Sequence, residues 1–205
     1  MDFSKPVTRE LVTKTIDALT KNGITAEIAE TAKEAKEIVL ARVPPGSEVM
    51  TMTSMTLEQT GIAKEINESD KYVSVRNKLN SMDKKTQSRE MQKMGATPEW
   101  TLGSVHAITE SGTVLVASGT GSQLPAYVYG SAHVIWVVGT QKIVKNIDEG
   151  MRRIQEYIVP LESERIKKVH GLKEYTSTVN KLLTLNRETV PQRIHIVFVE
   201  ENLGF

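Results

Sequence analysis

The sequence predicts an α/β protein, and three of its features carry this prediction. Helical and strand-like patterns alternate along residues 7–52, as expected for helices layered on a sheet. Residues 134–138 (VIWVV) are apolar without interruption, which is typical of a parallel strand covered on both faces. The apolar runs 48–52 and 114–117 each lead into small and hydroxyl residues, and α/β proteins bind their ligands at such strand ends.

The pattern of the first hundred residues predicts helices at 7–22, 31–42, 56–67 and 89–94 and strands at 24–28, 48–52 and 72–75. Gly23 is a favourable residue just past the first helix, and Pro-Pro-Gly at 44–46 ends the second. Thr56 and Gln59 have the spacing of a capping box at the start of the third. The polar segment 77–89 forms either an exposed helix or a mobile loop.

The second half of the chain is expected to contain a hairpin at 107–117, strands at 134–138, 182–185 and 194–199, and helices at 141–158 and 162–169. Ser111-Gly112 supplies the hairpin turn, and Pro160 is expected to end the long helix. Trp136 is expected in the core. Without repeats, low-complexity tracts or linkers, residues 1–205 are expected to form one domain.

Composition excludes several classes of function. The formal net charge is +1 and the basic residues are spread out, which gives no indication of nucleic-acid or membrane binding. The absence of Cys excludes disulfides, Cys-ligated zinc, an iron–sulfur cluster and a thiol nucleophile in this chain. The N-terminus lacks the apolar core of a signal peptide, and no apolar run approaches the ~20 residues needed to span a bilayer. We therefore expect a cytoplasmic protein.

Three segments, in order, resemble the LUD family, the lactate-utilisation domain. They are TMTSMTLE at 51–58, AITESGTVLVASGTGSQLPAYVYGSAHVIWVVGTQKIV at 107–144 and PQRIHIVFVEENLG at 191–204. The resemblance runs from about residue 47 to the last residue and is to a compact subtype, because the acidic segment of longer members is missing between 67 and 101. It implies a three-layer α/β/α sandwich related to ribose-5-phosphate isomerases and CoA transferases. It also implies a role in lactate oxidation to pyruvate, often alongside an iron–sulfur partner protein.

The strand-to-helix junction at 54–58 is the first candidate ligand site. Ser54, Met55 and Thr56 lie where exposed amides and the positive helix end favour a carboxylate or phosphate. The alternative is that Thr56 is an N-cap and Ser54 a turn residue. Glu58 either complements the helix dipole or acts as a general base over the cleft.

The predicted hairpin supplies the second candidate. Glu110 precedes the turn, with Gly112 and Thr113 after it. CoA transferases of the related fold use a glutamate that forms an acyl thioester, and Glu110 is the best candidate here for that role or for a general base. The alternative is an exposed carboxylate that bonds turn amides.

The loop after the hairpin is the third candidate. Ser118, Gly119, Gly121 and Gln123 form either an anion-binding nest or a flexible surface loop, and no Walker motif follows. His133 leads into the next strand, either as a structural residue or as a ligand contact.

The remaining polar and aromatic residues give weaker indications. The histidines show no spacing with carboxylates that would suggest a metal site. Lys142 opposes the dipole of the expected long helix, which hints at an anion nearby, but we interpret Lys142 and Lys181 as ordinary surface lysines. Tyr127 and Tyr129 are expected to be exposed and favour a homodimer.

Three functions remain open at this point. The chain either takes part in lactate or related organic-acid utilisation, binding a small organic anion, or is a stand-alone isomerase or CoA transferase acting on a phosphate or acyl ligand. The third possibility is an organic-acid sensor without turnover. The sequence carries no redox centre, so electron transfer would need an unknown cofactor or a partner subunit.

Overall fold

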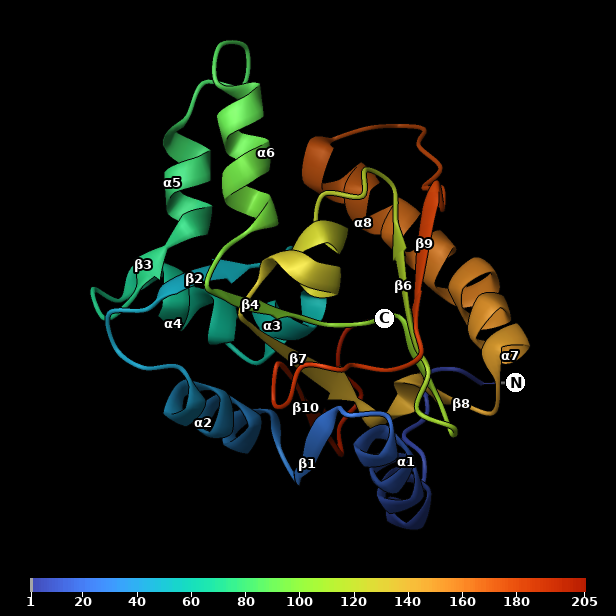
Figure 1. The fold of residues 1–205 in the computed structure, drawn as a ribbon. Coiled ribbons are helices and arrows are strands. Elements are labelled where there is room, and N and C mark those ends of the chain that lie inside the picture. Colours follow the sequence, from blue (N-terminus) through green and yellow to red (C-terminus); the bar gives the residue numbers. More distant parts are fainter. Residues whose placement is uncertain (1) are drawn as a thin grey trace.

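A computed structural model describes residues 2–205 and is shown as a ribbon in Figure 1. Its α-helices are α1 (Arg9–Lys21), α2 (Ala32–Arg42), α3 (Met55–Gln59), α4 (Ile62–Glu68), α5 (Val75–Ser81), α6 (Ser88–Ala96), α7 (Ile147–Arg152) and α8 (Val159–His170). Its strands are β1 (Thr25–Ala29), β2 (Glu48–Thr51), β3 (Val73–Ser74), β4 (Trp100–Gly103), β5 (Ala107–Thr109), β6 (Val114–Ser118), β7 (His133–Gly139), β8 (Ile143–Val144), β9 (Lys181–Leu185) and β10 (Ile194–Val199). Shorter turns of π and 3-10 type are η1 (Ala126–Gly130), η2 (Thr140–Lys142) and η3 (Arg153–Ile158).

The central layer is a parallel sheet with the strand order β1-β10-β7-β4-β2-β3. Successive side chains of the apolar strands β7 and β10 point to opposite faces of this sheet. In β7, Trp136 and Val138 pack on one face while Ile135 and Val137 pack on the other. Both faces are therefore buried, which confirms the interpretation of the apolar run at 134–138.

The two faces of the sheet are covered differently. Helices α2, α3 and α4 cover one face, where Val39, Leu57 and Ile66 are fully buried. The other face packs against α1, α5, η1 and a smaller sheet with the strand order β8-β5-β6-β9. The outer side of that small sheet packs in turn on the helix formed by α7, η3 and α8, through Ile154 and Ile158. The expected α/β/α sandwich is confirmed, with the small sheet and its helix added on one side.

The predicted bounds of the long helix, 141–158, are wrong at both ends. Residues 140–142 form a 3-10 turn, and the β-branched pair Ile143–Val144 pairs with β5 as a strand. The helix begins only after Asn146, whose side chain accepts a hydrogen bond from the Glu149 amide as an N-cap. Pro160 does not end it: it lies just after the π-helical turn η3, and the helix continues through α8 to His170. Lys142 is consequently not a residue of this helix.

Other differences are local. Strand β4 is absent from the expected elements, although it pairs with β2 and β7 at the centre of the sheet. The helix expected at 56–67 is divided by Gly61, whose φ is +70°, into α3 and α4. The polar segment 77–89 contains the end of α5 and the start of α6. Tyr127 is buried rather than exposed, while Tyr129 is 90% exposed. No helix within residues 2–205 is both long and apolar enough to cross a membrane.

Candidate functional site

Strands β2, β4 and β7 end side by side at one edge of the large sheet, and their connections leave in different directions. After β2 the chain enters α3 on one face, whereas after β4 it enters the small sheet on the opposite face. Such a reversal opens a crevice at the carboxyl ends of parallel strands. A cleft of about 1640 Å³ lies there, and its floor is formed by Thr56, Ser104 and Lys142.

The walls of the cleft come from segments far apart in the sequence. Figure 1 shows the α5–α6 hairpin and α8 rising on opposite sides, with the C-terminus between them. The loop at 118–123 and the last two residues, Gly204 and Phe205, complete the lining. The carboxylates that line the cleft are Glu58 and Glu162, whereas its basic residues are Arg76, Lys84, Arg89, Lys93, Lys142 and Arg165. This excess of positive charge favours an anionic ligand.

Lys142 is the charged residue at the floor of the cleft. Its side chain is almost fully buried, with the whole residue 3% exposed. The Nζ atom donates hydrogen bonds to Thr56 Oγ1 and Ser104 Oγ, both at 3.1 Å. No carboxylate of the described residues lies within 4.0 Å of it. Burial, and secondarily the positive charge of Arg153, lowers the pKa of Lys142 from 10.5 to about 7.

Thr56 and the C-terminal segment are packed together over this lysine. Thr56 Oγ1 lies 3.4 Å from the Leu203 carbonyl oxygen, to which it can donate. Gly204 has a φ of +67°, and a Cβ atom there would lie 2.4 Å from Thr56 Oγ1 and 3.2 Å from Lys142 Nζ. The Gly204 amide donates to Gln59 Oε1 at 2.6 Å. The expected capping box is therefore wrong: Ser54 caps α3, and Gln59 holds the C-terminal segment instead.

His106 and Arg153 lie beside the floor, where Arg153 is fully buried and His106 is half-buried. The Ala117 amide donates to His106 Nδ1 at 3.2 Å, which places the proton of the neutral ring on Nε2. Burial, with smaller contributions from Lys142 and Arg153, lowers the pKa of His106 to about 3. Arg153 donates from Nη1 to the His106 carbonyl oxygen at 2.7 Å, whereas its Nε and Nη2 have no partner among the described residues. Burial lowers the pKa of Arg153 to about 10.

Most of the predicted ligand-binding residues, and one of the two predicted catalytic carboxylates, Glu58, lie together at the cleft. They are Ser54, Met55, Thr56, Glu58, Ser118, Gly119, Gly121 and Gln123. The loop among them is internally bonded: Ser118 Oγ accepts from the Gly121 amide at 2.7 Å and donates to Gln123 Oε1 at 2.9 Å. These internal hydrogen bonds hold Ser118, Gly121 and Gln123 together on one wall of the cleft.

The structure does not bring the other predicted site residues to the cleft. Glu110 pairs with Lys14 at 2.9 Å and lines a separate pocket of about 240 Å³. A Cβ on Gly112 would meet the backbone of α1, and Thr113 Oγ1 donates to Asn186. His133 lies at the opposite end of β7, stacked on Trp100 with 4.1 Å between the ring centroids.

Sequence reasoning missed the residues at the centre of the site. Lys142 was interpreted as a surface lysine, and this is wrong. Ser104, His106 and Gly204 were not proposed as ligand residues. A usable signal was present for Lys142, because it follows the apolar strand 134–138 by four positions and the carboxyl ends of such strands carry ligand sites. Within residues 2–205, no group of three or more His, Asp or Glu residues is placed to hold a metal ion.

Comparisons with known proteins agree with the fold. The model of the LUD domain family matches residues 12–199. A DUF162 family protein from Deinococcus radiodurans has a similar structure, with a TM-score of 0.56 at 14% sequence identity, covering 95% of this chain and 99% of that one. eIF2B beta from Chaetomium thermophilum matches with a TM-score of only 0.37 at 18% identity, over 58% of this chain and 41% of that one. No curated protein sequence matches this chain significantly.

Proposed function

This chain belongs to the LUD domain family, and from that premise we propose that it takes part in the utilisation of lactate or a related organic acid. Its role is to bind a small organic anion at the floor of the cleft. The observation that carries this proposal is Lys142, a buried lysine at the carboxyl ends of the strands whose amine has only hydroxyl partners among residues 2–205.

A buried ammonium group requires a negative partner to be stable, because burial removes its hydration. The hydroxyls of Thr56 and Ser104 orient Nζ but do not neutralise it. A carboxylate or phosphate that enters the cleft would supply the missing charge. Binding would then be coupled to protonation of Lys142, since the anion favours the charged form.

The other cations of the deeper cleft are already engaged. The Arg165 guanidinium makes two hydrogen bonds of 2.7 Å to Glu162. The Arg76 guanidinium donates from Nε and Nη2 to the Thr51 carbonyl oxygen. Arg165 is therefore already neutralised by a carboxylate, and Arg76 is oriented by a backbone carbonyl oxygen. Lys142 differs from both because it lies at the floor and bonds only hydroxyl groups among residues 2–205.

A second function is favoured by the size of the cleft. Its volume of about 1640 Å³ exceeds the 300–1,000 Å³ that is typical of small-molecule sites. This favours a larger ligand, such as an acyl-CoA or a sugar phosphate, and keeps the stand-alone CoA transferase or isomerase as the alternative. Glu58, which lines the cleft, is then the candidate carboxylate, because Glu110 lies elsewhere.

Thermal unfolding in the presence of lactate, pyruvate, CoA esters and sugar phosphates tests the proposal. A ligand at 100 times its dissociation constant stabilises the protein by roughly 2.7 kcal/mol. We expect one class to raise the Tm of the wild-type protein and of the exposed-lysine control Lys145→Met, but not of Lys142→Met. An equal shift in Lys142→Met would contradict the proposed site.

The location and the partners of this protein are further predictions. Fractionation of source cells tests the predicted cytoplasmic location. Co-purification with the chain tests the predicted iron–sulfur partner protein. A homodimer is tested by measuring the mass of the purified protein in solution. Loss of growth on lactate after deletion is the expected phenotype, and normal growth would contradict a role in lactate utilisation.

A further inference from the structure

The hydrogen bonds of Lys142 match a neutral amine better than an ammonium ion. A neutral amine has two N–H donors and one lone pair, whereas an ammonium has three donors. Lys142 Nζ has two hydrogen-bond acceptors among the described residues, Thr56 Oγ1 and Ser104 Oγ. These use both donors of the neutral form and leave its lone pair unused.

The surroundings of this amine also favour the neutral form. The charged residue that most affects the pKa of Lys142 is Arg153 of η3, which is positive and fully buried. His106, from the segment after β4, is neutral and offers no negative charge. The carboxylates Glu58 of α3 and Glu162 of α8 line the cleft, but neither lies within 4.0 Å of Nζ. A substantial fraction of Lys142 is consequently unprotonated at neutral pH, with a pKa of about 7.

We propose that Lys142 is a nucleophilic amine that forms an imine with an anionic carbonyl compound, either a 2-oxo acid or an open-chain sugar phosphate. This inference rests on the proposed function and deepens it by naming the substrate class. We infer a carbonyl group in the substrate because an amine nucleophile forms an imine with a carbonyl carbon. We infer an anionic group in the substrate because basic residues outnumber acidic ones around the cleft.

The step balances without an oxidant, reductant or cofactor. The lone pair of Nζ forms a bond to the carbonyl carbon, the carbonyl oxygen gains a proton, and the nitrogen loses one to give a carbinolamine. The hydroxyl group then accepts a second proton and leaves as water while nitrogen forms the C=N bond. The hydroxyls of Thr56 and Ser104, both 3.1 Å from Nζ, can relay these protons between the nitrogen, the substrate oxygen and solvent in the cleft. The Nε2–H of the neutral His106 ring can donate a hydrogen bond but does not take up a proton.

Borohydride trapping tests this inference. The full-length protein is incubated with pyruvate or with ribose 5-phosphate in the presence of sodium cyanoborohydride, and the adduct is located by intact-mass measurement and peptide mapping. We expect one reduced adduct on Lys142 in the wild-type protein and in Lys145→Met, and no specific adduct in Lys142→Met. Lactate is the matched control, since it has the carboxylate of pyruvate without the carbonyl.

The two substrates distinguish a 2-oxo acid from a sugar phosphate, and the Tm measurement distinguishes imine formation from anion binding alone. An adduct with pyruvate alone supports a 2-oxo acid, and one with ribose 5-phosphate alone supports a sugar phosphate. If neither labels Lys142 while an anion still raises the Tm, the imine is overturned and the anion site stands. If neither a Tm shift nor an adduct is found, both proposals are overturned. Circular dichroism of Lys142→Met checks that the variant is folded.

Discussion

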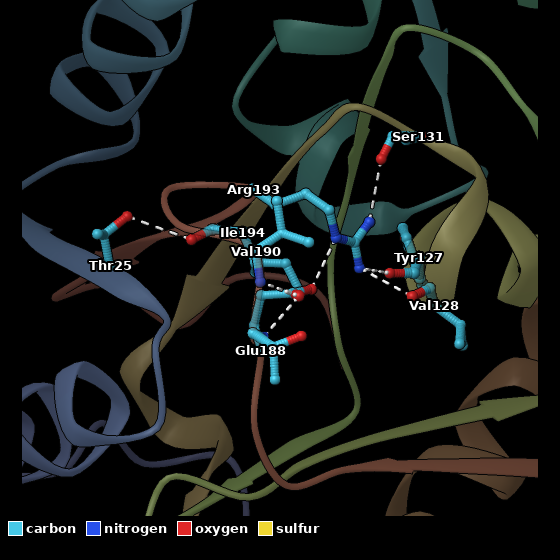
Figure 2. A network of polar contacts seen from close by, with 9 residues as sticks. Thr25, Tyr127, Val128, Ser131, Glu188, Val190, Arg193 and Ile194 are labelled. Carbon is cyan, nitrogen blue, oxygen red and sulfur yellow. Dashed lines mark hydrogen bonds and ion pairs between the residues drawn. The ribbon is translucent and has the colours of Figure 1, made fainter.

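Two buried cations lie at opposite ends of the large sheet, and their surroundings differ. Arg193 precedes β10, and Figure 2 shows all three of its guanidinium nitrogens bonded. Its Nε pairs with Glu188 at 2.7 Å, and its Nη1 donates to the Ser131 carbonyl oxygen at 3.1 Å. Its Nη2 donates to the carbonyl oxygens of Tyr127 and Val128 at the end of η1. Lys142, just past the carboxyl end of β7, has two hydroxyl partners and, among residues 2–205, no carboxylate partner.

The comparison distinguishes Arg193, which has a structural role, from Lys142, for which we propose a functional role. The network of Arg193 is complete within the chain, so it ties η1 and the segment 188–190 to the sheet without requiring a ligand. Lys142 is equally buried but incomplete, and a buried charge without a partner is destabilising. Such a residue is retained where it binds or reacts with something that enters the cleft.

The largest expected effect is on the structural cation. Arg193→Met removes the hydrogen bonds to four residues and leaves the Glu188 carboxylate, 9% exposed, without its cation. We expect the free energy of unfolding to fall by about 3–5 kcal/mol, measured by urea denaturation. Adding Glu188→Gln should recover part of this loss, because the unpaired charge is removed. A loss below about 1 kcal/mol would show that the network is not stabilising.

Lys142→Met is expected to act in the opposite direction and to depend on pH. The folded pKa of about 7 is below the ordinary 10.5, so the penalty of burying the charge is full below pH 7 and declines as pH rises toward 10.5. The stability of the wild-type protein relative to Lys142→Met should therefore rise by roughly 1.4 kcal/mol per pH unit in this window. Denaturation at pH 7, 8 and 9 measures it, and a difference independent of pH would contradict the lowered pKa.

A pair of glycine variants tests the packing over Lys142. Gly204 and Gly171 both have a positive φ, but nothing lies within 4 Å of a Cβ on Gly171, whereas one on Gly204 meets Thr56. Both alanine variants should lose about 1–2 kcal/mol because of the left-handed backbone. Gly204→Ala should lose more than Gly171→Ala, because its Cβ atom would also overlap Thr56 Oγ1. Only Gly204→Ala should also weaken the ligand-induced Tm shift. Equal ligand binding by the two variants would separate Gly204 from the site.

The smallest effect is expected at the carboxylate that the sequence favoured. Glu110→Gln breaks a pair with Lys14, whose side chain is 67% exposed, and should change stability by less than about 1 kcal/mol. Ligand binding should not change, because Glu110 lines a different pocket. The matched variant Glu58→Gln removes negative charge from the cleft and should strengthen anion binding. If Glu110→Gln lost ligand binding while Glu58→Gln kept it, Glu110 would have to be part of the site.

Part of the site could be predicted because it follows local patterns. Ser54 and Thr56 come directly after the apolar run of β2, and the loop that begins at Ser118 comes directly after β6. Glu110 was favoured on the analogy of a related fold, but its strand belongs to the small sheet and turns it toward α1. Lys142 was misplaced because isoleucines at helical spacing masked a strand whose partner, β5, is distant in the sequence.

The α/β class, the buried strands at 134–138 and 194–199 and the resemblance to the LUD family could all be predicted from the amino-acid sequence. These follow from hydrophobic periodicity and ordered motifs, which are local properties of a chain. The burial of Lys142 and Arg153 without a carboxylate partner among residues 2–205 depends on the packing of distant segments. Thr56, Ser104 and Lys142 come from three strand ends, and the Leu203 carbonyl oxygen that contacts Thr56 is 147 residues away from it. Burial and hydrogen bonding at that floor depend on sheet order, which no single segment encodes.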